Sequence, residues 1–135
     1  AGLRVGYAIA HTEIIDILNR IRSPFNVNAI GQQAAIAAIA AKYHVDRSRR
    51  HNDAGREQLL AACKTLKLHT LPSATNFITI DFAKPAMPIY QGLLEQGIIA
   101  RPLGNYDMPN HLRITIGSEK ECAKCITALT KILDH

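Results

Sequence analysis

The spacing of the apolar residues changes at Pro72–Ser73, and this change constrains the fold strongly. Before it, apolar side chains recur mostly at helical spacing. After it, apolar and polar side chains alternate over residues 76–82, as in a strand with one buried face. Helices followed by a strand–helix–strand series predict a two-layer α/β (α+β) domain, in which a small, mainly antiparallel sheet is backed by helices.

One strand and three helices are expected before the change. Residues 3–9 are apolar and strand-forming, which predicts a short buried strand that belongs to a different sheet from the later ones. The first helix has Thr12 as its expected N-cap and stops at Ser23–Pro24. The second follows an asparagine cap and runs to about Tyr43, and a longer third helix is expected over residues 46–68.

The second part of the chain contains the expected sheet. Gly97 suits the left-handed residue that follows a helix, and Ser118 with Glu121 forms a capping box that opens the last helix. The expected elements are, in order, a strand at 76–82, a helix at 87–96, a strand at 98–101, a loop at 103–111, a strand at 112–116 and the final helix.

Size and composition exclude several classes of protein. The 135 residues suit one globular domain, and 47% hydrophobic residues argue against wholesale disorder. No run approaches the roughly 20 apolar residues of a membrane span, so we expect no membrane anchor. Three cysteines are too few for a disulfide framework, which favours a cytoplasmic location. Cys122 and Cys125 are expected to pack in the core rather than to bind a metal.

The net charge of +5 has one dense source, a basic stretch at residues 42–56. Acidic residues such as Asp46 and Asp53 interrupt this stretch, which is typical of a solvated helix face. The alternative is a basic nucleic-acid-binding module, although no set of aromatic side chains for base stacking accompanies the basic residues.

Three arginines are candidates for binding an anion. Arg113 lies inside an apolar strand, where a buried guanidinium needs a negatively charged partner. Arg101 closes the preceding strand, so pairing of the two strands would place both groups near one site that suits a carboxylate or a phosphate. Arg4 is similarly placed between apolar neighbours. For Arg101 and Arg113, the alternative is a salt bridge to an aspartate or glutamate of the same chain.

Five segments together carry a resemblance to a known family. The segments are AGLRVGY at 1–7, RIRSPFNVN at 20–28, SATNF at 73–77, GIIARP at 97–102 and HLRITIG at 111–117. In this order along the chain they resemble the fold type I, pyridoxal-phosphate-dependent aminotransferases, and among these the histidinol-phosphate aminotransferases.

The resemblance implies a role for each arginine. Arg4 would bind the phosphate of pyridoxal 5'-phosphate, Arg113 the substrate carboxylate or its equivalent, and Arg101 the distal phosphate of the substrate. The implied substrates are histidinol phosphate or imidazole acetol phosphate, with glutamate or 2-oxoglutarate, in histidine biosynthesis. The family also implies a homodimer. Related aromatic aminotransferases and threonine-phosphate decarboxylases are the alternatives within this resemblance.

The resemblance further implies that part of the enzyme lies outside this chain. In the family, the Schiff-base lysine precedes the segment matched by residues 1–7. We therefore expect residues 1–10 to be the last piece of a large cofactor-binding domain, residues 11–42 to be connecting helices and residues 43–135 to be a small C-terminal domain. The chain alone is expected to be inactive, because it contains no catalytic residue of its own.

Overall fold

A computed structural model describes residues 2–134 of the protein. The chain divides into two compact units, Ala1–Asp46 and Arg47–His135. No helix within the described residues is both long enough and apolar enough to span a membrane.

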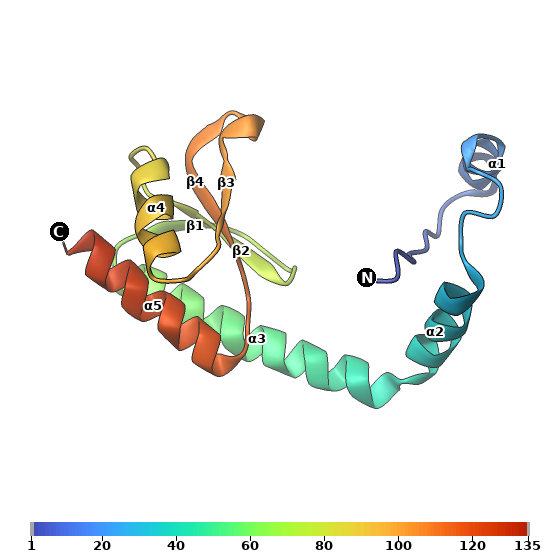
Figure 1. Cartoon of the computed structure of the whole chain (residues 1–135), viewed down its shortest axis with the longest axis horizontal. Helices are drawn as coiled ribbons and strands as arrows, with labels where there is room; N and C mark the ends of the chain where they lie inside the picture. Colours follow the sequence, from blue (N-terminus) through green and yellow to red (C-terminus); the bar gives the residue numbers. More distant parts are fainter. Residues whose placement is uncertain (1, 135) are drawn as a thin grey trace. The chain divides into compact units, whose positions relative to one another are not determined.

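Helices α1 (Thr12–Ile21) and α2 (Ala29–Ala40), labelled in Figure 1, lie wholly within the first unit. The expected cap of α1 is wrong: Thr12 is already helical, and the N-cap is His11, whose side chain makes no capping hydrogen bond. The expected asparagine cap of α2 is confirmed. The side chain of Asn28 accepts a hydrogen bond from the Gly31 N–H at 2.7 Å, as an N-cap residue should.

The strand expected at residues 3–9 does not form. A strand requires a neighbouring backbone edge, and no other part of this unit within the described residues is a strand. The segment instead packs against α2, where a Cβ atom added to Gly31 would lie 2.7 Å from Cγ2 of Val5. Tyr7 and Ile9 remain 86% and 91% exposed, so the expectation that this segment is buried is also wrong.

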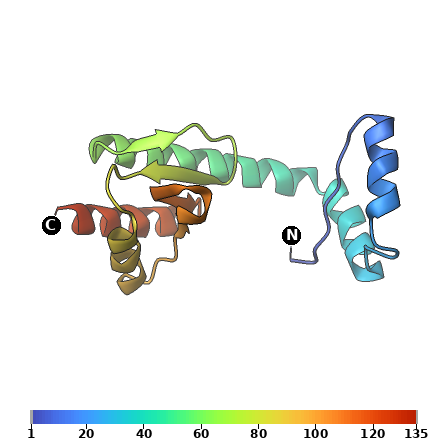
Figure 2. The same ribbon diagram turned by 90° about the horizontal axis from the view of Figure 1, so that it is seen from above.

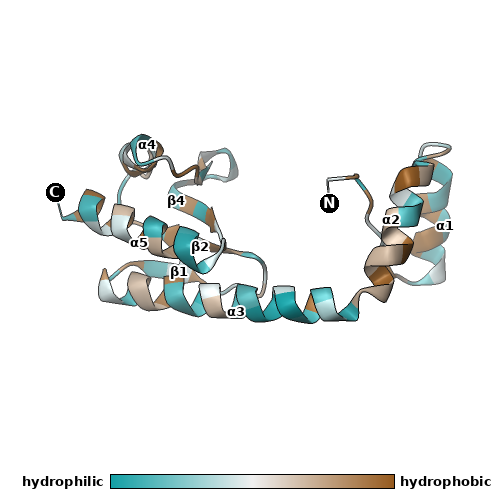
Figure 3. Ribbon diagram, turned by 60° about the horizontal axis from the view of Figure 1, so that its bottom comes forward, coloured by the Kyte–Doolittle hydropathy of each residue, from teal (hydrophilic) through white to brown (hydrophobic). Residues whose placement is uncertain are grey.

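Apolar side chains on α1 and α2 are unusually exposed, and both helices carry brown, hydrophobic residues in Figure 3. Among the described residues of these two helices, only Gly31 is buried. The exposed large side chains of α1 and α2 are Ile14, Ile17, Leu18, Ile21, Ile30, Ile36 and Ile39. So many exposed apolar side chains on two neighbouring segments are typical of a region that contacts further protein.

The long helix α3 (Lys42–Thr65) begins four residues earlier than expected and ends three residues earlier. Its first half is hydrophilic, seen as teal ribbon in Figure 3, and its residues are mostly exposed. Near the middle of the helix, Arg56 donates a hydrogen bond to Asp53 at 2.6 Å. The prediction of a solvated, mixed-charge helix face is therefore confirmed.

The second unit contains a four-stranded antiparallel sheet in the order β1–β2–β4–β3 (Figure 1). The strands are β1 (His69–Leu71), β2 (Phe77–Asp81), β3 (Arg101–Leu103) and β4 (Met108–Thr115). The expected antiparallel sheet backed by helices is confirmed. β1 was not expected, because three residues are too few to show an alternating pattern.

Two boundaries in the sheet were also predicted wrongly. Residues 98–100 lie outside any strand, and β3 begins only at Arg101 and includes Pro102. A proline is tolerated there because β3 is an edge strand. The expected loop at 103–111 is a single 3-10 turn, Gly104–Tyr106, after which β4 begins at Met108. The polar Asn110 belongs to the sheet because its carbonyl accepts a hydrogen bond from the Phe82 N–H at 3.0 Å.

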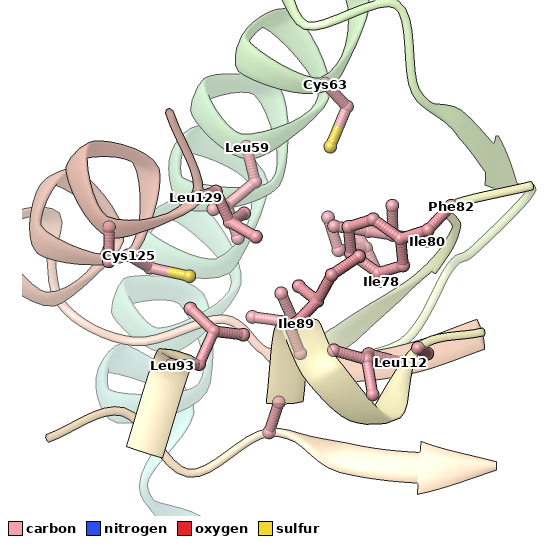
Figure 4. Packing of buried hydrophobic residues seen from close by; sticks show 14 of the residues in the cluster. Leu59, Cys63, Ile78, Ile80, Phe82, Ile89, Leu93, Leu112, Cys125 and Leu129 are labelled. Atoms are coloured by element: carbon pink, nitrogen blue, oxygen red, sulfur yellow. The ribbon is translucent and has the colours of Figure 1, made fainter. Parts of the chain in front are cut away.

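The core lies on one face of this sheet, against three helices (Figure 4). The expected inward face of β2 is confirmed, since Ile78, Ile80 and Phe82 are all buried. They pack with side chains from α3, from α4 (Met87–Glu95) and from α5 (Glu119–Leu133), among them Leu59, Cys63, Ile89, Leu93 and Leu129. Figure 2 shows α5 in red running alongside the C-terminal half of α3 in green.

Local features expected from the sequence determine the ends of the helices. Gly97 follows α4 with a φ of 71°, the left-handed conformation that glycine adopts easily. The capping box of Ser118 and Glu121 is present at the start of α5. Helix α3 approaches α5 closely at Gly55, where an added Cβ atom would lie 3.4 Å from Sγ of Cys122.

The buried cysteines lead to a prediction about stability at high pH. Burial raises the pKa of Cys63 and of Cys125 from 9.0 to about 11. Between these values the unfolded chain loses thiol protons that the native chain keeps, so the free energy of unfolding should fall as the pH rises from about 9 to about 11. Urea unfolding at several pH values measures this fall. The double variant Cys63→Ala with Cys125→Ala should show a shallower fall, and an unchanged slope would contradict the explanation.

Candidate functional site

The face of the sheet opposite the core carries two arginines, Arg101 and Arg113. Along β4, the half-buried Arg113 lies between Leu112 and Ile114, which point into the core. Its cross-strand partners are Thr79 on β2 and Arg101 on β3. Directly opposed residues in an antiparallel sheet lie on the same face, so Arg113 is flanked by Thr79 and Arg101. The expected pairing of the two arginine-bearing strands is confirmed.

The guanidinium of Arg113 forms no ion pair with any residue that the structure describes. Its Cζ atom lies 4.8 Å from the ring centroid of Phe77, and its Nε atom is buried without a hydrogen-bond partner. Within residues 2–134, neither Arg113 nor the exposed Arg101 forms a salt bridge. Among the described residues, neither arginine therefore forms the intramolecular salt bridge that was the alternative to anion binding.

Two guanidinium groups that oppose each other on one sheet face without a carboxylate are electrostatically unfavourable in isolation. An anion between them would remove this repulsion. Carboxylates and phosphates fit best, because the planar guanidinium fork offers two parallel charge-assisted hydrogen bonds. The arrangement of Arg101 and Arg113 is therefore a candidate anion-binding site.

The next row of the same face pairs Asp81 on β2 with His111 on β4. The Asp81 Oδ2 atom lies 3.8 Å from Nε2 of His111, and its Oδ1 atom accepts a hydrogen bond from the Ala83 N–H at 2.8 Å. The Nδ1 atom of His111 is buried without a partner. Sequence reasoning missed this pair because His111 was placed in a loop.

Arg4 belongs to the first unit and not to this sheet. Its side chain is exposed and forms no salt bridge with any residue in the described part of the chain. Its backbone has a φ of 58°, a left-handed conformation that non-glycine residues adopt at an energetic cost. The structure thus leaves the guanidinium of Arg4 available to a ligand such as a phosphate.

The cysteine pair has a structural explanation. Cys122 and Cys125 are 2% and 5% exposed and lie in the core cluster, which confirms the prediction that they are packing residues. Over residues 2–134, no group of three or more His, Cys, Asp or Glu side chains is arranged to hold a metal ion.

Comparison with known proteins identifies the family of the chain. The family model of aminotransferase class I and II matches residues 1–129. Among curated proteins, "Histidinol-phosphate aminotransferase 2" from Methylococcus capsulatus is 47% identical over 98% of this chain and 36% of its own length. A protein of the same name from Pseudomonas fluorescens is 48% identical over the same shares.

Solved structures agree with this result. A histidinol-phosphate aminotransferase from Sinorhizobium meliloti in complex with pyridoxal-5'-phosphate matches with a TM-score of 0.77 at 28% identity, over 88% of this chain and 33% of that chain. Another, from Clostridium acetobutylicum, has a TM-score of 0.80 over 90% of this chain and 38% of that chain, and its 20% identity shows a shared fold.

The chain spans about a third of the length of the curated relatives it matches, 36% for the Methylococcus protein. The family model nevertheless matches nearly the whole chain, and several relatives exceed 40% identity. The chain belongs to the class I and II aminotransferase family.

Proposed function

We propose that this chain is the C-terminal part of a pyridoxal-phosphate-dependent aminotransferase that transfers an amino group between histidinol phosphate and 2-oxoglutarate in histidine biosynthesis. The observation that carries the proposal is the cross-strand pair of Arg101 and Arg113, which has no carboxylate partner within the described residues. The names of the relatives support the same substrate.

Each of the two sheet arginines has a defined part in substrate binding. Arg113 binds the carboxylate of glutamate or 2-oxoglutarate, or the equivalent end of the phosphate-bearing substrate. Arg101 binds the distal phosphate of histidinol phosphate or imidazole acetol phosphate. Arg101 is exposed and lies directly opposite Arg113, so the pair can contact two anionic groups of one substrate or the two alternative substrates in turn.

Arg4 is the residue of this chain that fits the cofactor. Its exposed guanidinium, without a carboxylate partner among residues 2–134, matches a phosphate dianion by charge and by hydrogen-bond geometry. When bound, pyridoxal phosphate supplies an electron sink for the reacting carbon. The residues of this chain bind and orient the anionic ends of the cofactor and the substrates.

The rest of the catalytic machinery belongs to other parts of the proposed enzyme. We propose that residues 1–10 end the large cofactor-binding domain, that residues 11–42 connect it to the small domain, and that residues 43–135 form this small domain. The exposed apolar side chains of α1 and α2 support a role in contacting further protein. The proposed full-length enzyme is a cytoplasmic homodimer.

Mixing the isolated chain with pyridoxal phosphate tests whether this chain alone can bind the cofactor covalently and catalyse transamination. None of its seven lysines, Lys42, Lys64, Lys67, Lys84, Lys120, Lys124 and Lys131, lies in the lysine motif of the family. We expect no borohydride-sensitive absorbance from covalently bound cofactor and no transamination. The full-length holoenzyme, meaning the longer polypeptide loaded with cofactor, serves as the positive control. Turnover by the isolated chain would contradict the proposal.

Threonine-phosphate decarboxylation is the second candidate function, because its substrate also carries a phosphate that a second arginine could bind. An aromatic aminotransferase is less consistent with the pair, since one guanidinium fork satisfies the singly charged carboxylate of an aromatic amino acid, whereas a phosphate dianion offers three oxygens to both Arg101 and Arg113. The three possibilities differ in the substrate that the holoenzyme prefers.

A further inference from the structure

We propose that Phe77 is a positioning residue for Arg113, and that its ring is the platform that holds the guanidinium group ready for the anionic end of the substrate. This inference rests on the proposed function, because it assumes that Arg113 binds substrate. It adds a residue whose side chain carries no charge and no hydrogen-bonding group.

The register of the sheet brings the two residues together. Arg113 is directly opposite Thr79 on β2, and Phe77 lies two residues before Thr79 on the same face. Phe77 is therefore the diagonal neighbour of Arg113, within reach of a long side chain. The Cζ atom of Arg113 lies 4.8 Å from the centroid of the ring, a distance typical of a cation–π contact.

The ring holds the cation without using any of its hydrogen-bond donors. The side chain of Arg113 makes no hydrogen bond or salt bridge with another residue in the described chain, and its Nε atom is buried and unpaired. A carboxylate in place of Phe77 would orient the guanidinium as well, but it would neutralise the charge and occupy its N–H groups. An aromatic face restricts the position of the group and leaves these donors for a ligand.

The platform itself is fixed by the loop that precedes β2. The carbonyl of Phe77 accepts hydrogen bonds from Oγ of Ser73 at 2.6 Å and from Oγ1 of Thr75 at 3.3 Å. The carbonyl of Thr75 in turn accepts a hydrogen bond from the side chain of Asn52 on α3, at 3.2 Å. The backbone of Phe77 is thus held by the sheet on one side and by the loop and helix on the other.

Substitution of Phe77 in the full-length holoenzyme tests the inference. Phe77→Leu keeps an apolar side chain but removes the aromatic face, and we expect it to raise the KM for glutamate about three- to tenfold, with a smaller change in kcat. The Kd for glutarate, a dicarboxylate with no amino group, should rise by the same factor in calorimetry. Phe77→Tyr keeps the ring and should restore both values.

Two controls separate positioning from general stability. Phe82→Leu changes the same residue type on the core face, so it should lower the Tm without raising the KM for glutamate. In an Arg113→Ala background, Phe77→Leu should have no further effect on glutarate binding, because the guanidinium group that the ring positions is already absent. Equal KM and Kd values for Phe77→Leu and the wild type would overturn this inference alone. Failure of the wild-type holoenzyme to bind glutarate would instead contradict the proposed function.

Discussion

Replacement of Arg113 by alanine should lower kcat/KM for glutamate by at least about 100-fold in the full-length holoenzyme, because two charge-assisted hydrogen bonds are lost and each contributes about 1.5–3 kcal/mol. Arg113→Lys should keep the charge but lose the bidentate geometry, so an intermediate loss is expected. Steady-state kinetics with varied glutamate measures both effects.

A matched control distinguishes loss of the site from loss of charge. Arg49 is an exposed arginine on the solvated half of α3 and not on the sheet, and Arg49→Ala should leave kcat/KM unchanged. Arg113→Ala should also leave the fold intact, since the Nε atom that it removes has no hydrogen-bond partner. A kcat/KM for Arg113→Ala within twofold of the wild-type value would contradict the assigned role.

Leu112→Ala should cause the largest loss of stability, about 3 kcal/mol in the free energy of unfolding, because it leaves a cavity in a packed core. Leu112 is 0% exposed, lies on a central strand of the sheet and points into the core cluster from the residue next to Arg113. Urea unfolding followed by circular dichroism measures the loss as a lower midpoint.

The control for this prediction is Thr115→Ala on the same strand. Thr115 is exposed on the opposite face, so its truncation should change the free energy of unfolding by less than about 0.5 kcal/mol. An effect of Leu112→Ala below about 1 kcal/mol would mean that the helices do not pack on this face of the sheet as described.

The parts of the fold that could be predicted depend on residues close together in the sequence. Asn28 caps α2, Gly97 follows α4, and Ser118 with Glu121 opens α5, each through contacts within a few residues. The alternation in β2 similarly indicates which side chains face the core. These signals are local, so they remain visible without knowledge of the tertiary structure.

The parts that could not be predicted depend on pairing between distant segments. Asn110 is polar and follows a proline, yet it extends β4 because its carbonyl bonds to the Phe82 N–H. Residues 3–9 have a strand-like composition, but they remain irregular because the described part of their own unit contains no strand to pair with them. Composition cannot indicate whether a partner strand is present.

The same distinction applies to the site. Arg113 could be identified from the sequence because a cation between apolar residues is a local anomaly, and Arg101 because it ends a neighbouring apolar segment. The contact between Arg113 and Phe77 depends on the register of β2 against β4. A shift of one residue would move Phe77 to the other face, so this contact could not be inferred from the sequence.

The most direct test of the proposed function is the substrate preference of the full-length holoenzyme. We expect kcat/KM for histidinol phosphate, with 2-oxoglutarate as acceptor, to exceed that for phenylalanine by at least about 100-fold, because only the phosphate-bearing substrate can use a second guanidinium. No decarboxylation of threonine phosphate should be detected. A preference for phenylalanine, or release of carbon dioxide from threonine phosphate, would contradict the assignment of Arg101 and Arg113 to a histidinol-phosphate site.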